Sequence, residues 1–180
     1  FESAYAALDD AHMDPGEIES GFISVAAPEI CEQENMGSVV ADELGMIPRG
    51  FTQIVQACAG GAAGLRAACH MIMAGIYRRL LIVGIEKVSD STATAEVLLG
   101  SLDVEYEYPL GYDYIDMMAL METRYISKYH VSERPFAKFA VQDRWYSMRN
   151  PKAVDYGRPE LTVQEVLDAP MISWPITAPA

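Results

Sequence analysis

The sequence has few cysteines, and none of them lies in a spacing that suits a disulfide framework or a metal site. Three cysteines occur in 180 residues, and neither a C-x-x-C nor an H-E-x-x-H motif is present. The sequence also lacks a signal-peptide pattern and any apolar run near the roughly 20 residues that cross a membrane. These absences argue against a zinc protein, a disulfide-stabilised secreted domain and a membrane span. They predict a reducing, cytoplasmic location and no metal ligands.

Basic residues are scarce as well, since 13 Lys and Arg stand against 26 Asp and Glu, for a net charge of −13. Such a charge argues against nucleic acid as a partner. The window 124–158 is an exception, because it holds eight basic residues and three acids, a net charge of +5 against −18 elsewhere. The window suits a small anionic ligand, but two solvated helix faces or a subunit contact would also explain it. Its basic residues are Arg124, Lys128, Arg134, Lys138, Arg144, Arg149, Lys152 and Arg158.

Apolar periodicity in the first half of the chain predicts an α/β fold. Helical spacing and short β-branched runs alternate along it, and the last strand is apolar on both faces, as in a parallel sheet. The helix that precedes this strand is apolar nearly all round, so we expect it to be buried. The predicted helices are 2–12, 34–46 and 59–77, and the predicted strands are 21–28, 51–57 and 78–86.

The character of the sequence changes near residue 91. Residues 91–123 carry seven acids, no base and a tyrosine-rich stretch, and they predict irregular structure. Helices are predicted at 115–130, at 132–150 with Ser132 as N-cap, and within 160–170. We therefore expect two domains, an α/β half over residues 1–90 and a helical excursion over residues 91–180.

Cys58 is the candidate catalytic residue. It stands between a predicted strand and a helix that opens with Gly60, Gly61 and Gly64. The free N–H groups and positive dipole end of a helix favour a thiolate and can hold a developing oxyanion. So many small residues in one turn also suggest that something approaches the backbone there. The alternative is that Cys58 only fills space in a core.

The other two cysteines are weaker candidates. Cys69 is predicted in the middle of the same helix, away from a helix end, so we expect it to pack in the core. Cys31 follows a proline-containing loop with acids around it, which disfavour a thiolate.

The stretch VQACAGGAAGLRAACHMIMAGIYRRLLIVGIEKVSDSTATAE resembles the thiolase superfamily. In that superfamily a strand delivers the nucleophilic cysteine to the start of a central helix, and the next strand ends in a VGG-x-E-x-M-S segment. The corresponding segment here is VGIEKVSD, in which Ile85 replaces the second glycine and Val88 the methionine. Around the nucleophile, members of the superfamily usually have the sequence CASG, and this chain has CAGG at the corresponding position. The block ALMETRYISKYHVSERPFAKFAVQDRWYSMRNPKA and the tail TVQEVLDAPMISWPI are similar to sterol-carrier-type and archaeal thiolases, acetyl-CoA acetyltransferases among them.

The resemblance implies a thiolase-like α/β fold, one half of a duplicated α/β/α fold without its first strand, plus a helical loop-domain excursion. It implies coenzyme A thioesters as substrates, no prosthetic group, and a homo-oligomer, either dimer or tetramer. Coenzyme A is an anion rich in phosphate, so the excursion is expected to bind it through basic residues. Candidates are Arg124, Lys128, Arg134 and Lys138.

The activity that the resemblance implies is acyl transfer through a thioester on Cys58. Members of the family carry an activating histidine and a second cysteine in a C-terminal half, and these motifs do not occur here. We therefore expect a fragment that is inactive alone. Some sterol-carrier-type relatives imply alternatives: a lipid-binding or scaffold protein, or a β-hydroxyacyl-CoA lyase (aldolase) with a small partner subunit. The stretch with Tyr106, Tyr108, Tyr112 and Tyr114 could suit a tyrosine-based site, although loop packing also explains it.

Overall fold

The computed structural model describes residues 1–88, 98–103 and 105–179. The chain divides into two compact units, Phe1–Val97 and Leu98–Ala180. The boundary expected between residues 90 and 91 lies outside the described residues. Among the described residues, no helix is both long enough and apolar enough to span a bilayer.

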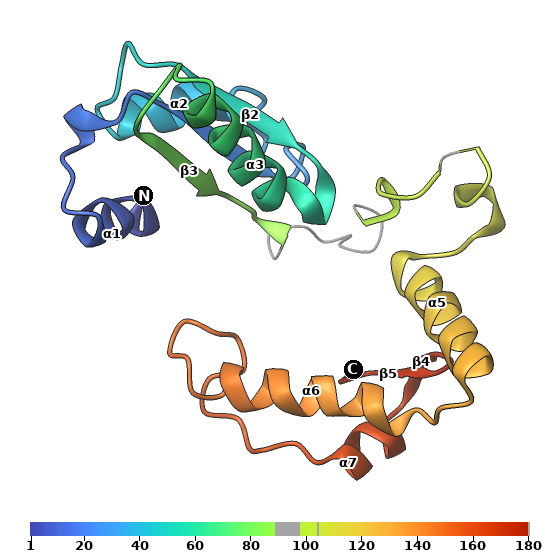
Figure 1. The fold of residues 1–180 in the computed structure, drawn as a ribbon. Coiled ribbons are helices and arrows are strands. Elements are labelled where there is room, and N and C mark those ends of the chain that lie inside the picture. Colours follow the sequence, from blue (N-terminus) through green and yellow to red (C-terminus); the bar gives the residue numbers. More distant parts are fainter. Residues whose placement is uncertain (89–97, 104, 180) are drawn as a thin grey trace. The chain divides into compact units, whose positions relative to one another are not determined.

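The first unit is built on a parallel three-stranded sheet, as predicted. β1 (Ser20–Val25) lies between β2 (Phe51–Val55) and β3 (Leu80–Gly84), in the order β2-β1-β3 (Figure 1). Val25 is paired with Val55, and Ser24 with Gly84. The three strands therefore end at the same edge of the sheet. β2 ends two residues earlier than predicted, because the chain turns at Gln56.

Helices cover both faces of this sheet. α1 (Glu2–Asp10) and α2 (Met36–Glu43) contribute Leu8 and Val40 to the main core, where they meet Ile23 and other buried side chains. α3 (Gly60–Met73) packs on the opposite face, which carries the neighbouring strand residues, since successive side chains of a strand point to opposite faces. A short 3₁₀ turn, Pro15–Glu17, connects α1 to the sheet.

The prediction that the third helix is buried all round is wrong for this chain. Only Gly60, Gly64 and Ala68 of α3 are buried, and these three face the sheet. The outer face exposes Leu65, and Met73 is 84% exposed. The prediction was based on the apolar residues of this helix alone, and these do not show whether other elements pack on one face of the helix or on both.

The second unit is helical, as predicted, with a small hairpin. α5 (Tyr114–Tyr129), α6 (Arg134–Ser147) and α7 (Val163–Asp168) precede β4 (Met171–Ser173), which pairs antiparallel with β5 (Ile176–Thr177). A 3₁₀ turn at Tyr108–Leu110 precedes α5. α6 packs against α7, and the buried Thr177 hydroxyl donates a 2.6 Å hydrogen bond to the Val166 carbonyl.

Two of these helices begin with reciprocal side-chain caps. The Asp113 carboxylate accepts from the Asp116 N–H, and the Thr162 hydroxyl oxygen accepts from the Glu165 N–H. The expected Ser132 cap is wrong, because α6 begins at Arg134 with Glu133 as N-cap and no side-chain cap bond. A proline in the first turn of α6 already supplies the backbone angle that favours helix initiation there.

Candidate active site

A tight turn joins β2 to α3 and carries Cys58. Gln56 leaves the strand with φ −147° and ψ 38°, and Ala57 then adopts a left-handed backbone with φ 42°. Cys58 is the middle residue of the 3₁₀ turn Ala57–Ala59, which the Ala59 N–H closes with a 2.9 Å bond to the Gln56 carbonyl. A left-handed alanine costs of order 1 kcal/mol or more, so the turn holds a strained conformation next to the thiol.

The thiol of Cys58 is exposed at the start of a 14-residue helix. No hydrogen bond or ion pair joins it to another side chain within the described part of the chain. Ala59 is the N-cap of α3 and provides no side-chain acceptor for the first-turn N–H groups. The Gly60 N–H bonds the Ala57 carbonyl, and no side chain caps the N–H groups that follow it, so these are the ones that an oxygen atom beside Cys58 can approach.

The glycines after Cys58 have two different surroundings. A β-carbon on Gly60 would overlap the Ser24 hydroxyl, and one on Gly64 would lie 3.3 Å from Ile82 Cγ2. These two glycines let α3 approach the sheet closely. Nothing lies within 4 Å of a β-carbon placed on Gly61. The expectation that the glycines leave space for an approaching ligand therefore fits Gly61 but not the other two.

The C-terminal edge of the sheet, where Cys58 lies, is tied together by Glu86. Its carboxylate accepts from the Ala26 N–H at 2.8 Å and from the Ala27 N–H at 3.3 Å. This side chain joins the segment after β3 to the segment after β1. Ligands of open α/β sheets bind beyond the carboxyl ends of the strands, which is the edge that carries Cys58.

The other cysteines lie elsewhere. Cys31 is half-buried and packs against the main core. Cys69 is exposed in the middle of α3, so the prediction that it packs in the core is wrong for this chain. The one-sided burial of α3 is the reason.

The four basic candidates lie in the second unit, on two helices. Arg124 and Lys128 belong to α5, and Arg134 and Lys138 belong to α6. All four are exposed. The Nζ atom of Lys128 lies 5.0 Å from the centre of the Tyr129 ring, and Arg134 donates a 3.5 Å hydrogen bond to the Gln164 side chain. No acid forms an ion pair with any of the four in the described ranges.

Three other basic residues of the window already pair with acids. Arg144 and Arg158 bind the two carboxylate oxygens of Asp155 at 3.1 and 3.0 Å, and Arg149 binds Glu160 at 3.2 Å. The two groups of cations therefore differ, since one is engaged within the unit and the other is open to an anion from solution.

Sequence reasoning missed two features of the site. Alanine rarely adopts positive φ, so nothing in the residue type at position 57 predicts the left-handed turn. Glu86 stands in the VGIE segment, but its bonds to Ala26 and Ala27 join positions about 60 residues apart along the chain. The signal that could have found it is its place directly after a predicted strand of a parallel sheet.

Comparison with known proteins identifies relatives that are similar in sequence to this chain. The chain is 24% identical over 176 residues to the acetyl-CoA acetyltransferase of Methanothermobacter thermautotrophicus, which covers 97% of the chain and 45% of the relative. The acetyl-CoA acetyltransferase of Methanocaldococcus jannaschii is also 24% identical, over 97% of the chain and 44% of the relative. The chain thus spans less than half the length of these relatives.

A solved structure and a family model cover most of the chain as well. The structure titled Ltp2-ChsH2(DUF35) aldolase superposes with a TM-score of 0.70 at 20% identity, over 98% of this chain and 44% of the other. At that identity the likeness shows the fold. The family model described as "Thiolase, N-terminal domain" matches residues 2–159. With its parallel sheet and its cysteine at the strand–helix turn, the chain belongs to the thiolase family, within the N-terminal domain of that family.

Proposed function

We propose that the protein transfers acyl groups between coenzyme A thioesters through a thioester on Cys58. The observation that carries the proposal is the exposed thiol at a strained turn, next to first-turn N–H groups of α3 that lack a side-chain cap. Membership of the thiolase family and the two acetyl-CoA acetyltransferase relatives support the reaction class. Because the chain spans less than half of those relatives, the proposal concerns the whole protein.

The proposed reaction has two covalent steps. The Cys58 thiolate attacks the carbonyl carbon of an acyl-CoA, the N–H groups at the start of α3 stabilise the oxyanion, and the bond to the CoA sulfur breaks. CoA leaves as a thiolate and takes up a proton. In the synthetic direction, a second acyl-CoA loses its α-proton to a base and attacks the Cys58 thioester. In the degradative direction, the Cys58 thiolate attacks the β-keto carbon of a 3-oxoacyl-CoA, and the bond between the α- and β-carbons breaks. Acetyl-CoA leaves as its enolate and takes up a proton at the α-carbon, and free CoA then removes the acyl group from Cys58 and releases the thiol.

The base that activates Cys58 is proposed to come from outside this chain. His70 belongs to the last turn of α3, ten residues after Gly60, which is about 15 Å along a helix. His12 and His130 lie beyond the ends of α1 and α5, and no hydrogen bond in the described ranges links either of them to Cys58. We therefore expect the 180-residue chain to be nearly inactive alone.

The second unit is proposed to bind coenzyme A. Its support is the set of exposed cations on α5 and α6 without an acidic partner in the described ranges: Arg124, Lys128, Arg134 and Lys138. The phosphates of coenzyme A are the groups that such cations complement. A dimeric or tetrameric assembly, a cytoplasmic location and the absence of a prosthetic group belong to the same proposal.

A second candidate function is cleavage of a β-hydroxyacyl-CoA side chain by an aldolase with a partner subunit. Its support is the fold likeness to the Ltp2-ChsH2(DUF35) aldolase together with exposed tyrosines before α5. Tyr106 is 73% exposed, Tyr108 52% and Tyr112 37%. A lipid-binding or scaffold protein without catalysis is a third candidate from the same resemblance.

Steady-state kinetics of the complete protein separate these candidates. The acyl-transfer proposal predicts cleavage of acetoacetyl-CoA by coenzyme A with ping-pong kinetics, and loss of this activity in Cys58→Ser. Retro-aldol cleavage that survives Cys58→Ser would favour the lyase. Neither activity, with retained binding of acyl-CoA, would favour the non-catalytic candidate.

A further inference from the structure

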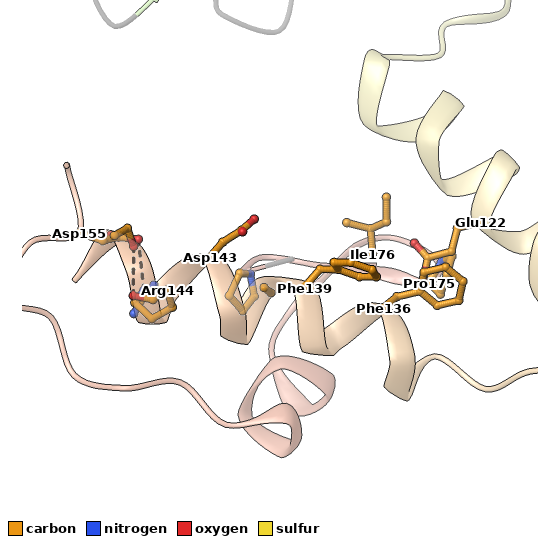
Figure 2. A pocket seen from close by; sticks show the side chains of 11 residues that line it. Glu122, Phe136, Phe139, Asp143, Arg144, Asp155, Pro175 and Ile176 are labelled. Carbon is orange, nitrogen blue, oxygen red and sulfur yellow. Dashed lines mark hydrogen bonds and ion pairs between the residues drawn. The ribbon is translucent and has the colours of Figure 1, made fainter. Parts of the chain in front are cut away.

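The second unit contains a groove that the proposed acyl transfer does not use. Its volume is about 510 Å³, within the range of ligand pockets, and its lining comes from α5, α6, the loop after α6 and β5 (Figure 2). Segments more than 50 residues apart in the sequence meet there, at Glu122 and Ile176. The four exposed cations proposed to bind coenzyme A are not among its lining residues.

The polar part of the groove carries unbalanced negative charge. At one end Asp155 pairs with Arg144, through the 3.1 Å ion pair drawn in Figure 2, and also with Arg158 at 3.0 Å, so three acids stand against two bases. Glu122 and Asp143 also line the groove, and neither pairs with a cation in the described part of the chain. Partial burial, and then the nearby charge of Glu133, raise the pKa of Glu122 above its ordinary value. The groove is thus acidic within the one basic window of the chain.

The apolar part of the groove suits an organic cation. Phe136 and Phe139 line it together with Pro175 and Ile176 (Figure 2). Phenylalanine faces attract guanidinium and ammonium groups, and carboxylates beside them add hydrogen-bond acceptors. A phosphate or a carboxylate ligand would instead face Glu122 and Asp143 at close range.

The aromatic lining of the groove is open to solvent. Phe139, which lines the groove, is 65% exposed, and Trp174, which directly precedes the lining residue Pro175, is 52% exposed. Aromatic and apolar side chains around a central hollow are typical of protein interfaces, where a few anchors insert into pockets. Open aromatic side chains beside the acids favour a polypeptide with apolar flanks over a small free cation.

We propose that this groove docks a polypeptide that inserts an arginine or lysine, flanked by apolar residues, between Glu122, Asp143 and the rings of Phe136 and Phe139. The occupant is a partner chain with a basic anchor. The proposal is independent of the acyl-transfer proposal, because it rests on the lining of the groove and not on Cys58.

Isothermal titration calorimetry with a defined peptide pair tests the proposal. The probe is acetyl-leucyl-arginyl-phenylalaninamide, and its control replaces the arginine with citrulline, which has nearly the same shape but no charge. We expect the arginine peptide to bind about 10-fold more tightly. Glu122→Gln and Asp143→Asn should each weaken binding of the arginine peptide about 3-fold, the usual effect of a partly exposed ion pair. In the double variant, the preference for the arginine peptide over the citrulline peptide should fall to about 2-fold. Glu105→Gln is the matched control, because Glu105 is an exposed acid outside the groove, and this variant should bind both peptides as the parent does.

Three results would overturn the proposal. The first is equal affinity for the two peptides, or no binding of either. The second is an equal loss in Glu105→Gln and Glu122→Gln. The third concerns a second copy of this chain as the occupant: sedimentation equilibrium would then show a dimer that the Glu122→Gln and Asp143→Asn double variant breaks and that the arginine peptide does not.

Discussion

The α-carbon of Gly60 lies so close to the Ser24 hydroxyl that a β-carbon at position 60 would overlap it. Gly60 opens α3, and Ser24 lies on the central strand β1. The contact therefore fixes the distance between the sheet and the helix start beside Cys58. The distance from the same hypothetical β-carbon to the Ser24 β-carbon is 3.6 Å, an ordinary van der Waals contact.

Gly60→Ala is expected to lower the free energy of unfolding by about 1–3 kcal/mol, the usual cost of overpacking. The added Ser24→Ala should restore most of this loss, because only the hydroxyl is in the way. Gly61→Ala is the control, since its β-carbon meets nothing within 4 Å, and it should be neutral or stabilising by up to about 1 kcal/mol. Urea denaturation of the parent and the three variants gives the values. A Gly60→Ala variant as stable as Gly61→Ala would contradict the contact.

Because the backbone at Ala57 is left-handed, a valine substitution there should destabilise the protein more than the same substitution at Ala59. Ala57→Val should cost about 1–3 kcal/mol of unfolding free energy, because a β-branched side chain tolerates a φ of 42° poorly. Ala59→Val is the control, since Ala59 has an ordinary φ of −89°. Ala57→Gly should stay within about 1 kcal/mol of the parent, because glycine relieves the strain but loosens the unfolded chain. Similar losses for the two valine variants in urea denaturation would argue against the strained turn.

The hydrogen bonds of Glu19 predict that the stability of the first unit falls at acidic pH. Its carboxylate accepts hydrogen bonds from the N–H groups of Arg78 and Arg79, and these bonds lower the pKa of Glu19. A carboxyl group whose pKa is lower in the folded state stabilises the fold above its unfolded pKa, about 4.3. That contribution disappears as the pH falls through the folded pKa.

Glu19→Gln should therefore lower the urea midpoint at pH 6 to 7, and the difference from the parent should shrink as the pH falls below about 4. Midpoints measured at several pH values between 7 and 3 check this. A constant difference across that range would mean that the carboxylate charge is not what stabilises the fold.

The exposed cations of the second unit predict how the complete protein discriminates substrates. Lys128→Glu and Lys138→Glu should each raise the KM for acetoacetyl-CoA about 2- to 5-fold, the effect of one exposed ion pair. The KM for acetoacetyl-pantetheine, which lacks the nucleotide phosphates, should not change. Arg149→Gln is the control, because Arg149 already pairs with Glu160 and stacks 4.0 Å from the ring centre of Trp145. Equal increases for both thioesters would remove these lysines from phosphate binding.

Local sequence chemistry predicted most elements of the fold. β-Branched runs gave the three parallel strands, and helical spacing gave α1, α2, α3, α5, α6 and α7 within a few residues of their ends. The thiol between β2 and α3 also follows from the sequence, since a strand-like run and a small-residue helix meet at Cys58.

Features that depend on contacts between distant residues could not be predicted in this way. The small size of Gly60 and Gly64 is explained by Ser24 and Ile82, which are 36 and 18 residues away along the chain. The acidic groove needs Glu122 and Ile176 on neighbouring elements. Apolar content likewise could not show that only one side of α3 is covered, and this is why the burial of Cys69 was predicted incorrectly.

Acyl trapping tests the role of Cys58 most directly. The complete protein is incubated with labelled acetyl-CoA without an acceptor, quenched in acid and mapped by peptide mass spectrometry. Acyl transfer through Cys58 predicts one acetyl group on the peptide that contains Cys58. The label should be lost in Cys58→Ser and retained in Cys69→Ser, since Cys69 is also exposed but lies in the middle of α3. Label that persists undiminished in Cys58→Ser, or that is lost equally in Cys69→Ser, would contradict acyl transfer through this thiol.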